Sequence, residues 1–231
     1  MWTTLRTCFR GLTSRRPATN REFVVRLVRR HRCRRVAEVG VWKGDLSRML
    51  LRRCALEHLL LVDPLERGRN LFVSHSRGPH PAMMEPGVYN CRMGEETLTQ
   101  AELDDVYAGL VAELDRDHPG RTTFLRLPSL DAAPLVADGS LDLVFIDAVH
   151  LYEDVLADIA AWLPKVAPGG VLAGDDYGPA FRGVIDAVDE VFPAEVRRVD
   201  PAAGVWHVRK NDIEGAKRRF MRCSGESRGC S

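Results

Sequence analysis

Three aspartates come shortly after two apolar segments and could together bind a divalent cation. Asp147 follows the apolar segment 141–146, and Asp175 and Asp176 follow the segment 171–173. If these segments are neighbouring parallel strands, their carboxyl ends lie only about 5 Å apart, so the three carboxylates converge and repel one another. A hard cation with oxygen ligands, Mg²⁺ or else Mn²⁺ or Ca²⁺, removes that repulsion. The alternative is that Asp175 or Asp176 only caps a helix or a turn.

His150 is the candidate base beside this predicted cation site. It lies about one helical turn after Asp147, near the expected start of a helix. The helix dipole disfavours an imidazolium there, so a neutral imidazole could accept a proton from a hydroxyl group. The alternative is a histidine that only forms a hydrogen bond with a neighbouring turn.

Two glycines and an acid suit a cofactor that contains a nucleoside. Gly40 allows a tight turn after the apolar segment 35–39, and Gly44 lets the backbone approach a ligand. Asp63, 25 positions after Glu38, can accept hydrogen bonds from both ribose hydroxyls. The spacing departs from the GxGxxG pattern of dinucleotide-binding proteins, which indicates a cofactor without a pyrophosphate grip. Turn-only glycines and a simple Asp-Pro turn at Asp63 are the alternatives.

Apolar strands alternate with amphipathic helices along the chain, as in a parallel sheet that is covered on both faces. The pattern therefore predicts an α/β fold with a doubly wound, mostly parallel seven-stranded sheet and an antiparallel C-terminal hairpin. The expected strands are 35–39, 59–62, 122–127, 141–146, 171–173, 195–199 and 204–209, and the expected helices are 22–30, one starting near the N-cap candidate Asp45, 98–115, 153–163 and 183–192. A turn at 168–170 is expected to lead into the fifth strand.

The composition is that of an ordinary globular protein, but the charge is unevenly distributed. The 231 residues include 33 Lys and Arg against 32 Asp and Glu, a net charge of +1. Residues 1–35 hold eleven arginines and one acid, so this head carries +10 and residues 36–231 carry −9. A solvated helix face, an organellar transit peptide and a patch for an anionic partner are the three interpretations of the head.

Several classes of partner and location are disfavoured. No apolar run reaches the roughly 18–20 residues of a membrane helix, and Arg6 and Arg10 interrupt any secretory signal. We therefore expect a cytoplasmic protein with reduced cysteines. No nucleic-acid partner is expected, because the basic head has few aromatic residues and the acidic body repels phosphate. The sequence leaves open whether the protein forms a homo-oligomer.

The chain divides into three parts without an internal repeat. Residues 1–35 are predicted as a basic N-terminal helical segment, 36–210 as the main domain and 211–231 as a mobile tail. Within the main domain, the segment 65–94 is rich in Gly and Pro and reads as a long irregular loop, a kind of segment that is usually functional.

The motifs of residues 36–209 resemble class I S-adenosylmethionine-dependent methyltransferases. Within that class, they are similar to the metal-dependent O-methyltransferases that act on sugars of macrolides and other glycosylated metabolites. The motifs are Glu-Val-Gly-x-x-x-Gly at 38–44, Val-Asp-Pro at 62–64, Ser-Leu-Asp-Leu-Val-Phe-Ile-Asp-Ala-x-His at 140–150, Trp-Leu-Pro-Lys at 162–165 and Pro-Gly-Gly-Val-Leu-Ala-Gly-Asp-Asp-Tyr at 168–177. The last two blocks, in this order and spacing, are the more specific signals.

For the cofactor, the resemblance implies S-adenosylmethionine held along the strand ends. Gly40 and Gly44 would pass beneath its methionine part, with Glu38 near the amino end. Asp63 would hold the ribose, and Ser129 would lie by the adenine. The segment 65–94 would then be a lid over the substrate of a methyltransferase domain at 36–210.

For the metal, the resemblance implies that Asp147, Asp175 and Asp176 bind Mg²⁺, with Asp147 also close to the cofactor and His150 as general base. Catechol-type relatives typically carry Asn where this chain has Asp176, which favours the sugar-type branch. The predicted function is therefore Mg²⁺-dependent methylation of a hydroxyl on a sugar or a glycosylated small molecule. A nicotinamide-dependent oxidoreductase and a catechol-type O-methyltransferase are the alternatives.

Overall fold

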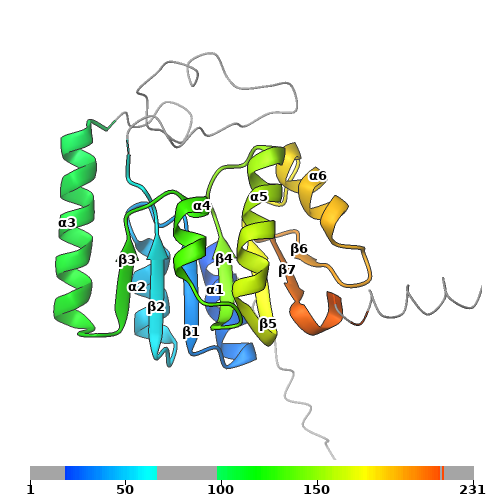
Figure 1. Ribbon diagram of the computed structural model, residues 1–231, viewed down its shortest axis with the longest axis horizontal. Coiled ribbons are helices and arrows are strands. Elements are labelled where there is room, and N and C mark those ends of the chain that lie inside the picture. Colours follow the sequence, from blue (N-terminus) through cyan, green and yellow to red (C-terminus); the bar gives the residue numbers. More distant parts are fainter. Residues whose placement is uncertain (1–18, 67–97, 214, 216–231) are drawn as a thin grey trace, which may run out of the picture.

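A seven-stranded sheet forms the centre of the protein (Figure 1), whose computed structural model describes residues 19–66, 98–213 and 215. The strand order is β3-β2-β1-β4-β5-β7-β6, with β1 to β5 parallel and β7 antiparallel to both of its neighbours. The predicted mostly parallel sheet and its antiparallel C-terminal hairpin are confirmed. The strands are β1 Arg35–Val39, β2 His58–Val62, β3 Thr122–Leu125, β4 Leu141–Ile146, β5 Val166–Gly174, β6 Arg198–Asp200 and β7 Val205–Arg209.

Helices cover both faces of the sheet, so the fold is doubly wound (Figure 1). One face carries α1 Asn20–His31, α2 Asp45–Arg53 and α3 Gln100–Asp117. The other face carries α4 Ser129–Ala132, α5 Tyr152–Trp162 and α6 Arg182–Val191, with the short 3₁₀ helices η2 Ala133–Leu135 and η3 Leu163–Lys165. None of the described helices is long and apolar enough to cross a membrane.

The central parallel strands β1, β2, β4 and β5 are largely apolar because each one contributes to two cores. In β2, Leu59 and Leu61 belong to the core under α1 to α3, whereas Leu60 and Val62 belong to the core on the opposite face, under α4 to α6. This division follows from the alternation of side chains along a strand. Each fully buried leucine contributes about 1.5–3 kcal/mol to the free energy of unfolding. Two apolar layers therefore hold the strand ends in place.

Several elements start at other residues than predicted, β6 for example at Arg198 instead of residue 195. Gly44, with φ of +78°, is the N-cap of α2, and Asp45 is its first residue, where its charge favours the positive end of the helix dipole. β5 begins at Val166, so the predicted turn at 168–170 lies inside the strand, next to a register shift against β4. The short helix α4, which starts at Ser129, had no signal in the hydrophobic pattern because it is a single turn.

The predicted division of the chain changes at both ends. Helix α1 belongs to the packed body, because its buried face, including Val24 and Val28, lies in the core under the sheet. At the other end, Asn211 accepts a hydrogen bond from Gly169 and Ile213 is buried, so the packed part extends beyond residue 210. The predicted lid from residue 67 on, residues 1–18 and most of the predicted tail lie outside the described residues.

Candidate active site

Four chain segments leave the sheet at the same edge and build the candidate site. The first residue beyond each of β2, β1, β4 and β5 donates its backbone N–H to the last residue of a neighbouring strand, at N···O distances of 2.7–3.2 Å. Because neighbouring strands lie about 4.8 Å apart, the four positions span roughly 14 Å. They are Asp63, Gly40, Asp147 and Asp175.

Gly40 holds the turn after β1 against the end of β4. Its φ is +91°, and a Cβ atom there would lie only 1.8 Å from the carbonyl oxygen of Asp147. Gly44 is similarly enclosed, since a Cβ atom at this position would lie 2.5 Å from the Leu110 side chain. Gly40 is thus required by packing against the Asp147 backbone as well as by the predicted tight turn, whereas a side chain at Gly44 would displace the end of the Leu110 side chain.

We expect Gly40→Ala to destabilise the protein strongly, because the added methyl group must push the Asp147 backbone away. The expected loss is roughly 3 kcal/mol or more of unfolding free energy, measured by urea denaturation. The matched control is Gly120→Ala, which has a similar φ of +70° but open space around the added Cβ. It should lose only about 1 kcal/mol. Equal losses in the two variants would contradict the packing role of Gly40.

Asp63 holds the loop between β1 and α2. Its Oδ2 accepts hydrogen bonds from the backbone N–H groups of Val41 and Trp42, at 2.9 and 2.8 Å, and its Oδ1 accepts one from Leu65 at 2.8 Å. Burial raises the pKa of Asp63, and the three N–H donors oppose that rise. The predicted contact with a ribose stays a prediction, while the structure gives the carboxylate a loop-holding role.

Glu38 lies near the end of β1, almost fully buried, and accepts a hydrogen bond of 2.6 Å from the Ser47 hydroxyl. Burial raises its pKa to about 8, although the Ser47 hydrogen bond opposes the rise. The carboxyl group is therefore mostly protonated at neutral pH. Its predicted place beside the amino end of a cofactor is not tested by these contacts.

Ser129 takes part in a buried polar network. Its hydroxyl donates to the carboxylate of Asp158 and accepts a hydrogen bond of 2.8 Å from the indole N–H of Trp162. Sequence reasoning missed Asp158, although its spacing carried a signal. With Val155, Ile159 and Trp162 it occupies the buried face of α5, where an acid needs a partner.

The buried carboxyl of Asp158 should make stability depend on pH. Burial raises its pKa to about 6 from an ordinary 3.8, despite the Ser129 hydrogen bond. The folded state therefore binds the proton of the Asp158 carboxyl more tightly than the unfolded state does. The stability that this proton binding provides is lost as the pH rises from about 4 through 6. Between pH 4 and pH 7, wild type should lose up to roughly 3 kcal/mol relative to Asp158→Asn in urea titrations. A constant difference between the two proteins over this range would contradict the shift.

Asp147, His150 and Asp176 come together from two loops. One ligand atom of each lies within 4.8 Å of the others. In the part of the chain that the structure describes, these three form the group of His, Cys, Asp or Glu side chains that lie close enough together to hold a metal ion. The His150 Nε2 lies 3.7 Å from a carboxylate oxygen of Asp147 and 3.1 Å from one of Asp176. The imidazole is only 4% exposed, whereas the carboxylate side chains are 37% and 28% exposed, so the acids face the solvent side.

The loop after β5 presents Asp176 in an uncommon backbone conformation. Its φ of +56° lies in the left-handed region, which Asp tolerates better than most residues but which still carries strain. The strain is consistent with a side chain that is held in position for a function.

The surroundings of His150 differ from the prediction based on the helix dipole. Burial favours the neutral imidazole, but a hydrogen bond and the charge of Asp147, with the charges of Asp176 and Asp175, raise the pKa of His150. The ring also packs against Phe181, with centroids 4.9 Å apart. Without a cation to neutralise them, the nearby carboxylates therefore affect the pKa of His150 more strongly than the helix dipole does.

Asp175 lies to one side of that group. It is 6% exposed, and its Oδ2 accepts a hydrogen bond from the side-chain amide of Asn20. Burial raises the pKa of Asp175 to about 8, with the charges of Asp147 and Asp176 adding to the rise. Sequence reasoning missed Asn20, since no spacing pattern links it to a partner 155 residues away in a segment predicted to lie outside the main domain.

The donor set fits the predicted cation. The two partly exposed carboxylates of Asp147 and Asp176 offer oxygen ligands of the kind that suit Mg²⁺, and the His150 imidazole lies beside them, within 4.8 Å of both. The ion would also relieve the repulsion between acids that lie this close.

Comparisons with known structures show the fold. CalS11, a calicheamicin methyltransferase, is similar over 81% of this chain and 77% of its own, with 17% identity and a TM-score of 0.54. An O-methyltransferase from Bacillus cereus, solved in complex with S-adenosylhomocysteine, is similar over 84% of this chain and 82% of its own. Its identity is 15% and its TM-score 0.50.

Comparisons of sequence show the family. The protein y4gI of Sinorhizobium fredii is 30% identical over 73 residues, which are 32% of this chain, and the chain spans only 8% of that relative's length. A family described as a methyltransferase domain matches residues 37–177, from β1 to just beyond the acids that follow β5. Because this match covers more than half of the chain, the chain belongs to that family and carries a class I S-adenosylmethionine-dependent methyltransferase domain.

Proposed function

We propose that the protein is an Mg²⁺-dependent O-methyltransferase that transfers the methyl group of S-adenosylmethionine to a hydroxyl of a sugar or a glycosylated small molecule. The observation that carries the proposal is the meeting of Asp147, His150 and Asp176 at the carboxyl edge of β4 and β5. Ligands bind at this edge in open α/β sheets. Family membership favours methyl transfer over the nicotinamide-dependent alternative.

Asp147 and Asp176 would hold the cation, and the second oxygen of Asp175 is the third candidate ligand. When bound, the ion would lower the pKa of a hydroxyl that it coordinates. Both Asp147 and Asp176 are partly exposed, so a substrate with two adjacent hydroxyls can approach them from the solvent side.

His150 would act as the general base. Its Nε2 lies beside both carboxylates and can take a proton from a hydroxyl placed between them. The nearby acids raise the pKa of His150, so neutralising their charge with a cation brings the imidazole toward the neutral form that a base needs. Packing against Phe181 limits the motion of the ring.

The ends of β1 and β2 would hold S-adenosylmethionine, which supplies the sulfonium methyl group. Glu38, Gly40, Gly44 and Asp63 lie around the loop between β1 and α2, next to Asp147, which follows the neighbouring strand β4. Ser129 would lie by the adenine. Its hydroxyl group is held by hydrogen bonds with the Asp158 carboxylate and the Trp162 indole.

Removal of divalent metal tests the proposal most directly. Transfer of radiolabelled methyl groups to a panel of glycosylated acceptors should stop in EDTA and return when Mg²⁺ is added in excess. Binding of S-adenosylhomocysteine should persist in EDTA, which separates loss of metal from loss of cofactor binding. Full methyl transfer in EDTA would contradict the metal role.

The acceptor panel also tests the substrate class. Asp176 stands where catechol-type enzymes typically carry Asn, which supports acceptors with vicinal sugar hydroxyls over catechols. The panel should therefore include matched glycosides, their aglycones and simple catechols. Methylation of catechols with no transfer to any glycoside would favour the catechol-type alternative.

A further inference from the structure

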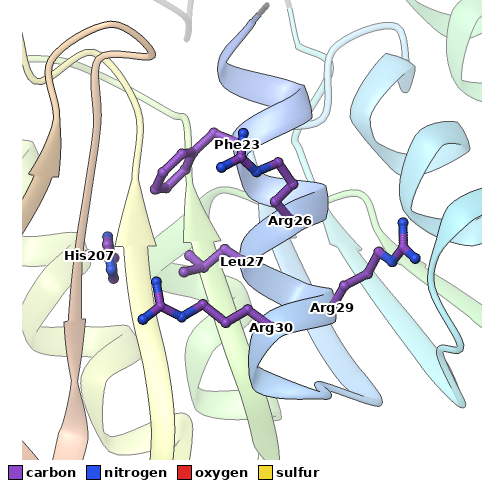
Figure 2. A pocket seen from close by; sticks show the side chains of 6 residues that line it. All are labelled: Phe23, Arg26, Leu27, Arg29, Arg30 and His207. Carbon is purple, nitrogen blue, oxygen red and sulfur yellow. The ribbon is translucent and has the colours of Figure 1, made fainter. Parts of the chain in front are cut away.

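A groove with a basic rim runs between α1 and β7, beside the candidate site (Figure 2). It has a volume of about 460 Å³, which is within the range of small-molecule pockets. In Figure 2, Arg30 extends from α1 toward His207 on β7, and Phe23 lies on the same side of the helix with Leu27 between them. The lining residues are Phe23, Arg26, Leu27, Arg29, Arg30 and His207.

The two sides of the groove offer different chemistry. The rings of Phe23 and His207 lie 5.7 Å apart and tilted by 52°, which leaves aromatic surface beside the buried Leu27. Burial and the positive charges of His31, Arg30 and Arg198 lower the pKa of His207 to about 4. His207 is therefore neutral at physiological pH and offers a ring, while the charge comes from the arginines.

The rim is strongly basic. Arg26, Arg29 and Arg30 are exposed and occupy one stretch of α1. Within the described residues, no carboxylate forms an ion pair with Arg29 or Arg30. In Figure 2, Arg30 points toward His207 whereas Arg29 points to the opposite side of α1, so the Arg30 guanidinium is the one placed to meet phosphate oxygens in the groove.

The two ends of the chain are poor occupants of such a groove. Residues 1–18 contain four arginines and no acid, and residues 216–231 contain five Lys and Arg and one Glu. Both stretches would be repelled by the rim. A duplex or a membrane would contact the rim but could not fill a hollow of this size, so a small anionic molecule with a planar part suits it better.

We propose that this groove binds a phosphorylated ligand of the nucleotide class, with its planar ring against Phe23 and His207 and its phosphates at the Arg30 side. The groove starts one helical turn from Asn20, which contacts Asp175 at the candidate site. A ligand bound here therefore lies next to that site but uses none of the residues assigned to the metal or to S-adenosylmethionine.

Calorimetric titration with GDP tests the proposal. The titration is done on the full chain in EDTA with saturating S-adenosylhomocysteine, so that neither the acid cluster nor the cofactor site can bind the probe. We expect Arg30→Glu to weaken GDP binding at least tenfold and Arg30→Gln to weaken it less. The control Arg116→Glu, an exposed site on α3 at the opposite end of the sheet, should stay within twofold of wild type.

Two further probes separate the parts of the groove. Phe23→Ala should weaken the binding of GDP and guanosine several-fold and leave pyrophosphate binding unchanged, whereas Arg30→Glu should weaken both phosphorylated probes. Unchanged binding of S-adenosylhomocysteine shows that each variant is folded. Because this control and the GDP titration need neither Mg²⁺ nor methyl transfer, the test does not depend on the proposed function. The proposal is wrong if wild type does not bind GDP, if Arg30→Glu binds it normally, or if only anionic vesicles or duplex DNA bind in an Arg30-dependent way.

Discussion

Replacing Asp147 with alanine abolishes Mg²⁺-supported methyl transfer, with an expected loss of at least 10²–10³-fold in kcat. Asp147 is the acid shared by the predicted cation site and the cofactor edge. Its backbone N–H is fixed by Val39, and its carboxylate lies 3.7 Å from His150. Removing the carboxylate takes away one of the two acids that would hold the ion and the partner that raises the pKa of His150.

The measurement compares methyl transfer and Mn²⁺ binding in wild type, Asp147→Ala and the control Asp115→Ala. Asp115 is an exposed acid on α3, far from the edge where β4 ends. Asp147→Ala should lose both metal binding, read from the electron paramagnetic resonance of free Mn²⁺, and turnover. The control should keep both. Wild-type Mn²⁺ binding by Asp147→Ala would refute the assignment of this residue as a ligand.

Replacing His150 with alanine lowers kcat by about 10²–10⁴-fold while S-adenosylhomocysteine binding remains. The imidazole is nearly buried, lies 3.1 Å from Asp176 and packs against Phe181, so it is positioned at the acids and has few other rotamers. A general base at this place takes the proton that a coordinated hydroxyl must lose. Apart from Asp147, the cofactor residues lie on or after other strands, so cofactor binding should be unaffected.

Rescue by added imidazole distinguishes a base from a structural histidine. In His150→Ala the lost ring leaves a space beside Phe181, and free imidazole should restore part of the turnover in a concentration-dependent way. His150→Gln retains more of the volume and should be stable, but it should be as inactive as the alanine variant. Turnover of His150→Gln near the wild-type rate would show that the residue only supports the fold.

The pattern of apolar residues in the sequence predicted most of the architecture. Continuous apolar strands such as β2 predicted burial on both faces, and amphipathic stretches such as α5 predicted covering helices. The acids after β4 and β5 followed from the same pattern, because the carboxyl ends of parallel strands share one edge. The sequence did not predict the single-turn helix α4 or the early start of β5, because neither one helical turn nor a Pro-Gly-Gly stretch has a detectable periodicity.

The sequence by itself thus determined which elements form, their order, and which acids and which histidine stand at strand ends. Only the tertiary structure decided the contacts of those groups. Asp63 binds three backbone N–H groups, Asp175 is held by Asn20, and the groove opens between α1 and β7. The physical reason is that periodicity records the face on which a residue lies. The partner it meets there depends on strand order and helix placement, which long-range packing of the whole chain sets.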